Sequence, residues 1–232
     1  MLDQRRPEQE KIHRTVEIRE DILSRNNAGA AVIRRELRQK GVFYLNIMAS
    51  PGSGKTSLLL RLIEGLRKDF RIGVIEADID SEVDAETISR TGVKTLQMHT
   101  DGACHITCQM SREALEALGI EDLDIVILEN IGNLVCPAEF DTGAERNLVL
   151  LSVPEGDDKP LKYPLMFEVA SAVAVTKADV APAFDFSMER ARENIHKRNP
   201  EAPVFFTSAR TGEGVGDVEA YIRAEIARLK NV

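Results

Sequence analysis

The sequence contains no tryptophan, only three cysteines among its 232 residues, and aromatic side chains at 5% of its positions. Three cysteines are too few for a disulfide scaffold, and scarce aromatics argue against a platform on which unpaired nucleic-acid bases could stack. The 38 acidic residues outnumber the 30 basic ones, which gives a net charge of −8. Because nucleic-acid binding depends on basic surface, the composition predicts that nucleic acid is not a partner.

Long hydrophobic runs are also missing from the sequence. The longest apolar stretches, such as residues 169–175, are far shorter than the roughly 20 residues that a membrane-spanning helix requires. Residues 1–20 are charged throughout and lack the apolar centre of a signal peptide. We therefore expect no membrane partner and a cytoplasmic location, where thiols stay reduced and are available to metals.

The first forty residues have a helical pattern. Residues 14–25 and 28–40 carry apolar side chains near helical spacing, and Asn26, Asn27 and Gly41 interrupt or end the pattern. Asparagine and glycine favour helix ends, so the pattern predicts two helices with solvated, charged faces. We assign residues 1–41 to a helical lead-in packed on the core and residues 42–232 to the main domain.

From residue 42 onward, short apolar runs alternate with helical patterns. Runs of strand composition occupy residues 42–48, 71–77, 94–98, 124–128, 147–153, 172–175 and 204–207. Helical patterns occupy residues 58–66, 111–117, 187–198 and 218–229. This alternation predicts an α/β fold with a mostly parallel sheet that helices cover on both faces. The proline-rich segment 154–164 is predicted to be a surface loop.

A glycine-rich segment joins the first predicted strand to the following helix; it reads Gly52, Ser53, Gly54, Lys55, Thr56 and Ser57. In this context the glycines let backbone N–H groups converge on nucleotide phosphates, Lys55 reaches the β and γ oxygens, and the Thr56 hydroxyl binds Mg²⁺. Ala49 stands where the motif usually has its first glycine, and we expect this change to leave the phosphate-binding backbone in place. The motif predicts a P-loop NTPase in which Lys55 is catalytic.

Carboxylates follow two of the predicted strands. Asp78 follows the strand at 71–77, and Glu129 follows the strand at 124–128. A carboxylate at such a strand end can hold Mg²⁺ directly or through water, so we predict Asp78 and Glu129 to be catalytic magnesium ligands. The backbone N–H of Gly132 can contact the γ-phosphate. The alternative is that these acids only cap the next turn, and for Asp84 the two interpretations are equally balanced.

Two further segments bear on the identity of the base. Lys177 and Asp179 follow the strand at 172–175, where Asp179 can accept hydrogen bonds from N1–H and N2–H₂ of guanine, and Lys177 can lie across the base. Thr176 replaces the asparagine usual in this motif. After the last strand, Ser208 and Ala209 fit a loop whose backbone N–H meets guanine O6. Two such elements in this order favour GTP over ATP.

The cysteines lie near histidine in two loops. Cys104 and His105 are adjacent, Cys108 follows, and Cys136 lies after the Glu129 segment. Thiolate and imidazole suit Zn²⁺ or Ni²⁺, but free buried cysteines are often inert, so the residues alone leave both interpretations open.

Four stretches together resemble the HypB family of hydrogenase nickel-incorporation GTPases, over about residues 15–225; they are residues 50–56, 102–105, 129–137 and 152–164. The resemblance implies a P-loop domain that hydrolyses GTP with Mg²⁺ and forms a homodimer in the GTP state. It also implies a Ni²⁺ or Zn²⁺ site at the subunit interface, built from Cys104, His105 and Cys136. The implied partners are a HypA-like nickel-donor accessory protein and the large subunit of [NiFe] hydrogenase.

The sequence departs from the family pattern at several places, among them Ala77 in place of the usual glycine before Asp78 and Ser81 in place of the usual threonine. No cysteine precedes Cys104 and the only earlier histidine is His13, so we expect the Cys- or His-rich nickel site of many relatives to be missing. Ile106, Thr107 and Cys108 replace the usual residues after the Cys-His pair. A GTPase of the urease type is disfavoured because the sequence has no Cys-Pro-His tripeptide, and one of the cobalamin-mutase type lacks the cysteine pair. A nucleotide-bound docking module with little turnover remains an alternative.

Overall fold

The computed structural model describes residues 6–78, 83–100 and 102–230. Seven strands form the centre of the fold: β1 (Phe43–Met48), β2 (Ile72–Asp78), β3 (Lys94–His99), β4 (Ile125–Glu129), β5 (Arg146–Ser152), β6 (Ala172–Thr176) and β7 (Val204–Phe206). The helices are α1 (Arg6–Lys40), α2 (Lys55–Leu66), α3 (Val83–Ser89), α4 (Cys108–Leu118), α5 (Cys136–Glu139), η1 (Val153–Glu155), α6 (Lys159–Lys162), α7 (Pro164–Glu168), η2 (Ala178–Ala183), α8 (Met188–His196) and α9 (Val215–Lys230).

The strands pair in the order β3-β2-β4-β1-β5-β6-β7, and every pairing is parallel. The predicted α/β fold is confirmed, and the sheet is parallel throughout rather than mostly so. Because the strands are all parallel, β1, β2, β4 and β6 end at the same edge of the sheet. From β1 the chain first adds β2, β3 and β4 along one edge of β1 and then β5, β6 and β7 along the other. In open parallel sheets the ligand crevice lies where the strand order reverses, which here is beside β1.

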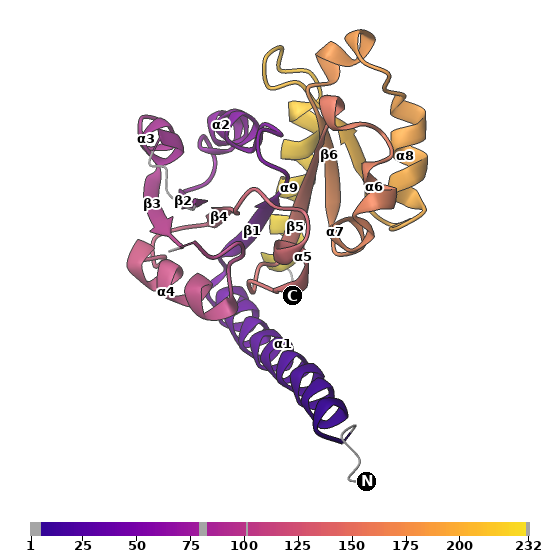
Figure 1. Ribbon diagram of the computed structural model, residues 1–232. Helices are drawn as coiled ribbons and strands as arrows, with labels where there is room; N and C mark the ends of the chain where they lie inside the picture. The colour runs from indigo at the N-terminus through magenta and orange to yellow at the C-terminus, as the bar shows by residue number, and fades with distance from the viewer. Residues whose placement is uncertain (1–5, 79–82, 101, 231–232) are drawn as a thin grey trace.

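Helices cover both faces of the sheet. Leu45 and Ile47 of β1 pack on one face against α2 and α9, whereas Tyr44 packs on the other face against α1 and α4. On that second face, β5 and β6 pack against α7 and α8. In Figure 1, α2 and α3 lie on one side of β2 and β4, and α4 lies on the other. The alternation of side chains along β1 therefore fixes a core on each side.

The two predicted N-terminal helices are one continuous helix, α1, so that prediction is wrong. Asn26 does not end the helix because the body of the protein satisfies its side chain: Nδ2 donates to the Asp141 carbonyl at 2.8 Å, and Oδ1 accepts from the Cys108 backbone N–H at 2.8 Å. Beyond Asn26, residues Ala30, Ile33 and Leu37 are buried, whereas the other end of α1 points away from the sheet (Figure 1). Within the described ranges, no helix combines the length and the apolar character needed to cross a bilayer.

The segment 154–164 also differs from its prediction. It forms η1, α6 and the start of α7 rather than an irregular loop, with Asp157 and Pro160 buried and Leu161 40% exposed. The side chain of Asp157 accepts hydrogen bonds from the Ser187 backbone and from Arg190, which attaches the segment to α8. The proline content did not distinguish an irregular loop from short helical turns attached to the body of the protein.

Candidate functional site

The glycine-rich segment lies between β1 and α2, as predicted. Gly52 and Gly54 have φ angles of 70° and 93°, in the left-handed region that glycine tolerates without steric cost. Ser53 is buried, and α2 begins at Lys55, so the backbone N–H groups of the first helical turn are available to a phosphate. The local sequence therefore builds an anion cradle of the P-loop type.

Thr56 and Glu129 come together beside this cradle. The Thr56 Oγ1 donates to Glu129 Oε1 at 2.7 Å, and Glu129 is 2% exposed at the end of β4. Glu76 of β2 pairs in register with Glu129 and is equally buried, although the sequence interpretation favoured Asp78 in that strand. Asp78 is the last residue of β2, and the side chains of Asp78 and Asp84 lie outside the described part. A hydroxyl and buried carboxylates are the hard oxygen donors that Mg²⁺ prefers.

The residues after Glu129 contact two different places. A Cβ atom at Gly132 would lie 3.0 Å from the backbone of Pro51 in the phosphate loop, so glycine is needed for this close approach. The Asn133 side chain donates to the Cys104 carbonyl at 3.4 Å and accepts from the Val135 N–H at 2.8 Å. The segment 129–136 therefore lies against the phosphate loop and against the loop that carries Cys104.

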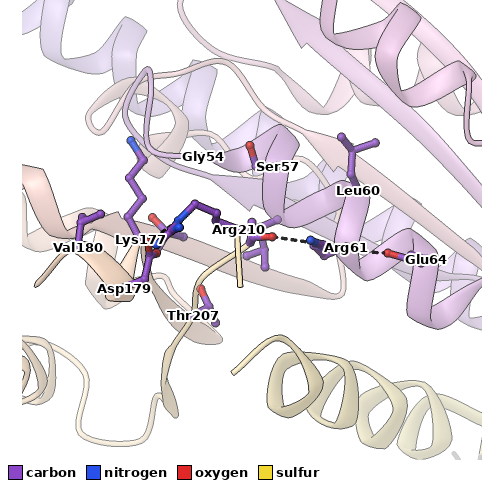
Figure 2. Close-up of a pocket in the computed structure, with 13 residues that line it drawn as sticks. Gly54, Ser57, Leu60, Arg61, Glu64, Lys177, Asp179, Val180, Thr207 and Arg210 are labelled. Carbon is purple, nitrogen blue, oxygen red and sulfur yellow. Dashed lines mark hydrogen bonds and ion pairs between the residues drawn. The ribbon is translucent and has the colours of Figure 1, made fainter. Parts of the chain in front are cut away.

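A cavity of about 610 Å³ opens beside the phosphate loop (Figure 2). Lys177 and Asp179 reach it from the end of β6, and Ser57 and Arg61 reach it from α2. Lys177 has a φ angle of 58°, and its Nζ donates to the Gly52 carbonyl at 2.7 Å. The Thr176 hydroxyl donates to the Ser53 carbonyl at 2.6 Å, so the residue that replaces asparagine contacts the phosphate loop.

Asp179 is held by the loop that follows β7. Arg210 Nε donates to Asp179 Oδ2 at 2.9 Å, and Arg210 Nη2 forms an ion pair with the same oxygen at 2.8 Å. A hydrogen bond from Ser208, and then the Arg210 guanidinium, keep the pKa of the Asp179 carboxyl below its ordinary value. Ala209 also lines the cavity, and its carbonyl accepts from Arg61 Nε at 2.8 Å. The structure thus brings together the four residues predicted to recognise the base.

On the α2 wall of this cavity the sequence predicted Ser57 but neither Arg61 nor Glu64. Ser57, Arg61 and Glu64 all line it, and they recur at helical spacing on one face of α2. That spacing is the one signal that could have found Arg61. Arg210 directly follows Ala209 in the sequence, and nothing local predicts that it pairs with Asp179.

Cys104, His105 and Cys136 form a cluster in which the candidate ligand atoms lie within 4.8 Å of one another. Cys104 Sγ is 3.7 Å from His105 Nδ1, so the two adjacent residues can face one ion. The His105 ring stacks on Phe140 with ring centres 3.8 Å apart, which fixes its orientation. These three residues are the set that the resemblance implied.

The pKa shifts in this cluster favour a protonated Cys136 thiol and a neutral His105 imidazole, so a metal would bind with release of a thiol proton. A hydrogen bond with Cys104, together with burial, raises the pKa of the Cys136 thiol. Burial lowers the pKa of His105, so its imidazole is neutral at physiological pH and keeps a lone pair for a metal. Metal binding at the thiols must then displace protons, as is usual for cysteine ligands.

Cys108 stands apart from the cluster. It begins α4 and packs against α1, where a Cβ atom added to Gly29 would lie 2.6 Å from its sulfur. Burial raises the pKa of this thiol, which makes it less reactive. Its place is that of a packing residue between α4 and α1.

The parallel sheet and its cradle define a P-loop nucleotide-binding domain. The family model described as CobW/HypB/UreG, nucleotide-binding domain, matches residues 43–206. The chain belongs to this family and, within it, to the HypB group of hydrogenase maturation factors.

Individual relatives support this membership. The hydrogenase maturation factor HypB of Rhizobium leguminosarum is 44% identical over 93% of this chain and 72% of its own length. The hydrogenase/urease maturation factor HypB of Helicobacter pylori is 42% identical over 89% of this chain and 86% of its own length. The crystal structure of Helicobacter pylori HypB in complex with nickel superposes with a TM-score of 0.83 at 39% identity, covering 88% of this chain and 96% of that one.

Proposed function

We propose that this protein is a GTP-hydrolysing metallochaperone that carries nickel, or zinc, on Cys104, His105 and Cys136 and supports nickel insertion into [NiFe] hydrogenase. The observation that carries the proposal is the segment 129–136, which touches the phosphate loop at Pro51 and the Cys104 loop through Asn133. The names of the relatives agree, since they are hydrogenase maturation factors and one was solved with nickel.

The nucleotide chemistry is assigned to the cradle and its neighbours. Lys55 and the backbone N–H groups of residues 52–57 hold the phosphates of GTP or GDP, and the Gly132 N–H meets the γ-phosphate. Thr56, Asp78 and Glu129 hold Mg²⁺, which neutralises charge on the β- and γ-phosphates. Lys55, Asp78 and Glu129 are the residues we assign to catalysis.

Base selection is assigned to the cavity beside the cradle. Asp179 accepts from N1–H and N2–H₂ of guanine, and adenine offers no donors at those positions. The stem of Lys177 covers one face of the base. Ser208 orients the Asp179 carboxylate, and the Ala209 N–H meets guanine O6. We therefore assign GTP rather than ATP as the substrate.

Nickel is treated as the cargo of the cluster. Two thiolates and one imidazole leave at least one coordination position to be filled by water or by a second subunit. In a homodimer formed with GTP, the two clusters meet across the two-fold axis and complete each other's coordination. Nucleotide and metal affinities are then reciprocally linked, because each ligand favours the same dimeric state.

Hydrolysis relaxes the contact between the segment 129–136 and the phosphate loop, and the metal passes on. We assign a HypA-like accessory protein as nickel donor and the hydrogenase large subunit as the recipient of nickel. A cytoplasmic location follows from these partners.

Gel filtration combined with metal analysis tests the proposal. We expect a dimer with bound nickel in the presence of Mg²⁺ and a non-hydrolysable GTP analogue, and a monomer with less nickel in the presence of GDP. Equal oligomeric state and equal nickel content with the two nucleotides would overturn the proposed mechanism.

A further inference from the structure

The segment 152–164 stood out in the sequence, and the proposed function gives it no role. Its acidic residue Glu155 is 14% exposed at the side chain and accepts three hydrogen bonds. Ser50 Oγ donates to Oε1 at 2.5 Å, and the Ser152 N–H and Oγ donate to Oε2 at 2.9 and 2.8 Å. Lys159 Nζ lies 3.9 Å from the same carboxylate. Glu155 therefore fastens the segment to Ser50, the second residue of the phosphate loop.

The opposite side of the segment is fastened to α8. Asp157 Oδ2 accepts from the Ser187 N–H at 2.7 Å and from Arg190 at 2.9 and 3.1 Å. Asn194 of the same helix donates to the Asp157 carbonyl at 3.0 Å. Two carboxylates only two positions apart thus hold different parts of the protein, Glu155 the phosphate loop and Asp157 the helix α8.

Side chains from other segments hold the phosphate loop at Gly52, Ser53 and Ser50. Lys177 holds the Gly52 carbonyl and Thr176 holds the Ser53 carbonyl, both from the end of β6. Ser50 lies nearer the start of the loop, and Glu155 fixes it there. A binding loop held in its bound shape loses less conformational entropy when the ligand arrives.

We propose that Glu155 is a positioning residue that pre-organises the phosphate loop through Ser50. The proposal rests on the proposed function only in that it requires a nucleotide phosphate in this loop. Hydrogen bonds to an ionised carboxylate are short and stronger than those between neutral groups, so one such bond can hold a loop segment in place. Lys159 and the three donors offset the negative charge, which would otherwise disfavour a phosphate nearby.

A double-mutant cycle on nucleotide affinity tests the proposal. The dissociation constant of a fluorescent GDP is measured for the wild type, Ser50→Ala, Glu155→Ala and the double variant. We expect each single change to weaken binding about tenfold, the factor for one charge-assisted hydrogen bond, and the double change to weaken it by the same amount. Ser50→Ala removes one oxygen atom only, so the test does not depend on the Glu155 variant alone. Additive losses, or wild-type affinity in Glu155→Ala, would overturn the proposal.

Asp157→Asn is the matched control, because Asp157 holds α8 rather than the phosphate loop. We expect it to lower thermal stability while leaving GDP affinity within about twofold. Glu155→Gln retains an acceptor for Ser50 and is expected to bind GDP more tightly than Glu155→Ala. An Asp157→Asn loss of affinity as large as that of Glu155→Ala would mean that Glu155 acts only through stability, which contradicts the proposal.

The outcomes also separate this inference from the proposed function. If the wild type binds adenine nucleotides instead of guanine nucleotides, the proposed function fails, and the same cycle is run with ADP. If the wild type binds GDP and the cycle is additive, the inference on Glu155 fails while the proposed function is unaffected.

Discussion

Thr56 of α2 donates a hydrogen bond to Glu129 at the end of β4, across 2.7 Å. The hydroxyl belongs to the phosphate loop, and the carboxylate begins the segment that continues to Cys136. This contact is the first link of a short path: Gly132 lies against Pro51, Asn133 bonds the Cys104 carbonyl, and Cys136 joins the metal cluster. We propose that bound nucleotide and bound metal influence each other along this path.

Glu129→Gln tests the catalytic assignment. The amide keeps the size of the side chain and an acceptor for Thr56, but it removes the charge that a magnesium ion needs. We expect kcat for GTP hydrolysis to fall at least about 100-fold, with GDP affinity measured in the absence of Mg²⁺ little changed. Glu113→Gln, an exposed acid on α4, is the control. Wild-type turnover by Glu129→Gln would contradict the role of Glu129.

Cys136→Ala tests the metal assignment. Removing one of three clustered ligands should lower Ni²⁺ affinity at least about tenfold while GDP affinity stays near that of the wild type. Cys108→Ala is the matched control, because Cys108 packs against α1 outside the cluster, and it should retain nickel. Metal titration monitored by equilibrium dialysis measures both. Equal losses in the two variants would count against the cluster.

The Asp179–Arg210 pair predicts a specific pH dependence. The pKa of Asp179 in the folded protein lies below the value of about 3.9 expected of an unfolded chain. Above that value Asp179 is ionised and can accept hydrogen bonds from the base. It loses its charge only as the pH falls through the lower pKa of the folded protein. Arg210→Met removes one cause of the lowered pKa, so the acid limit of GDP binding should move to higher pH. Binding measured down to about pH 3.5 detects this.

Arg90→Met is the control for that pH experiment. Arg90 is an exposed arginine whose side chain lies 4.0 Å from Glu86 on α3. Its removal changes the net charge by the same amount as Arg210→Met does. An equal shift of the acid limit in the two variants would attribute the effect to net charge and not to the Asp179 contact.

Asn26→Ala tests why α1 continues through two asparagines. The change removes both hydrogen bonds of the buried side chain and leaves the Asp141 carbonyl and the Cys108 N–H without this partner. We expect a loss of about 1–3 kcal/mol in the free energy of unfolding, measured by urea denaturation. Asn27→Ala, at the exposed neighbouring position, should change it by less than about 0.5 kcal/mol. Equal effects would contradict the role of Asn26.

Gly132→Ala tests the contact between the segment 129–136 and the phosphate loop. The added Cβ would meet the Pro51 backbone at 3.0 Å, so the loop must shift, at a cost of about 1–3 kcal/mol. We expect weaker binding of a GTP analogue and a smaller effect of that analogue on Ni²⁺ affinity. Gly216→Ala, where nothing lies within 4 Å, is the control. Unchanged binding and coupling in Gly132→Ala would argue against this contact.

The parts of the site that sequence could predict are those encoded by local pattern. Gly52 and Gly54 adopt the left-handed backbone that the motif requires, and the strands before and after them follow from apolar runs. The Cys104, His105 and Cys136 cluster came from resemblance, because the spacing alone left inert thiols as an alternative. At the glycine motif and at the strands, the local sequence preference and the fold agree.

The remainder depends on contacts between residues far apart in the chain. Asn26 continues a helix because Asp141 and Cys108 satisfy it, and Glu155 finds Ser50 more than one hundred positions away. No local preference predicts such partners, since the same side chains favour caps and turns in isolation. The segment 154–164 was misjudged for the same reason.

We propose that nucleotide and metal affinities are linked through the segment 129–136. The most direct test is a Ni²⁺ titration of the protein saturated with Mg²⁺ and either GDP or a non-hydrolysable GTP analogue. We predict that nickel binds at least about fivefold more tightly with the analogue, and that nickel tightens analogue binding by the same factor. Identical Ni²⁺ affinity with the two nucleotides would contradict the account.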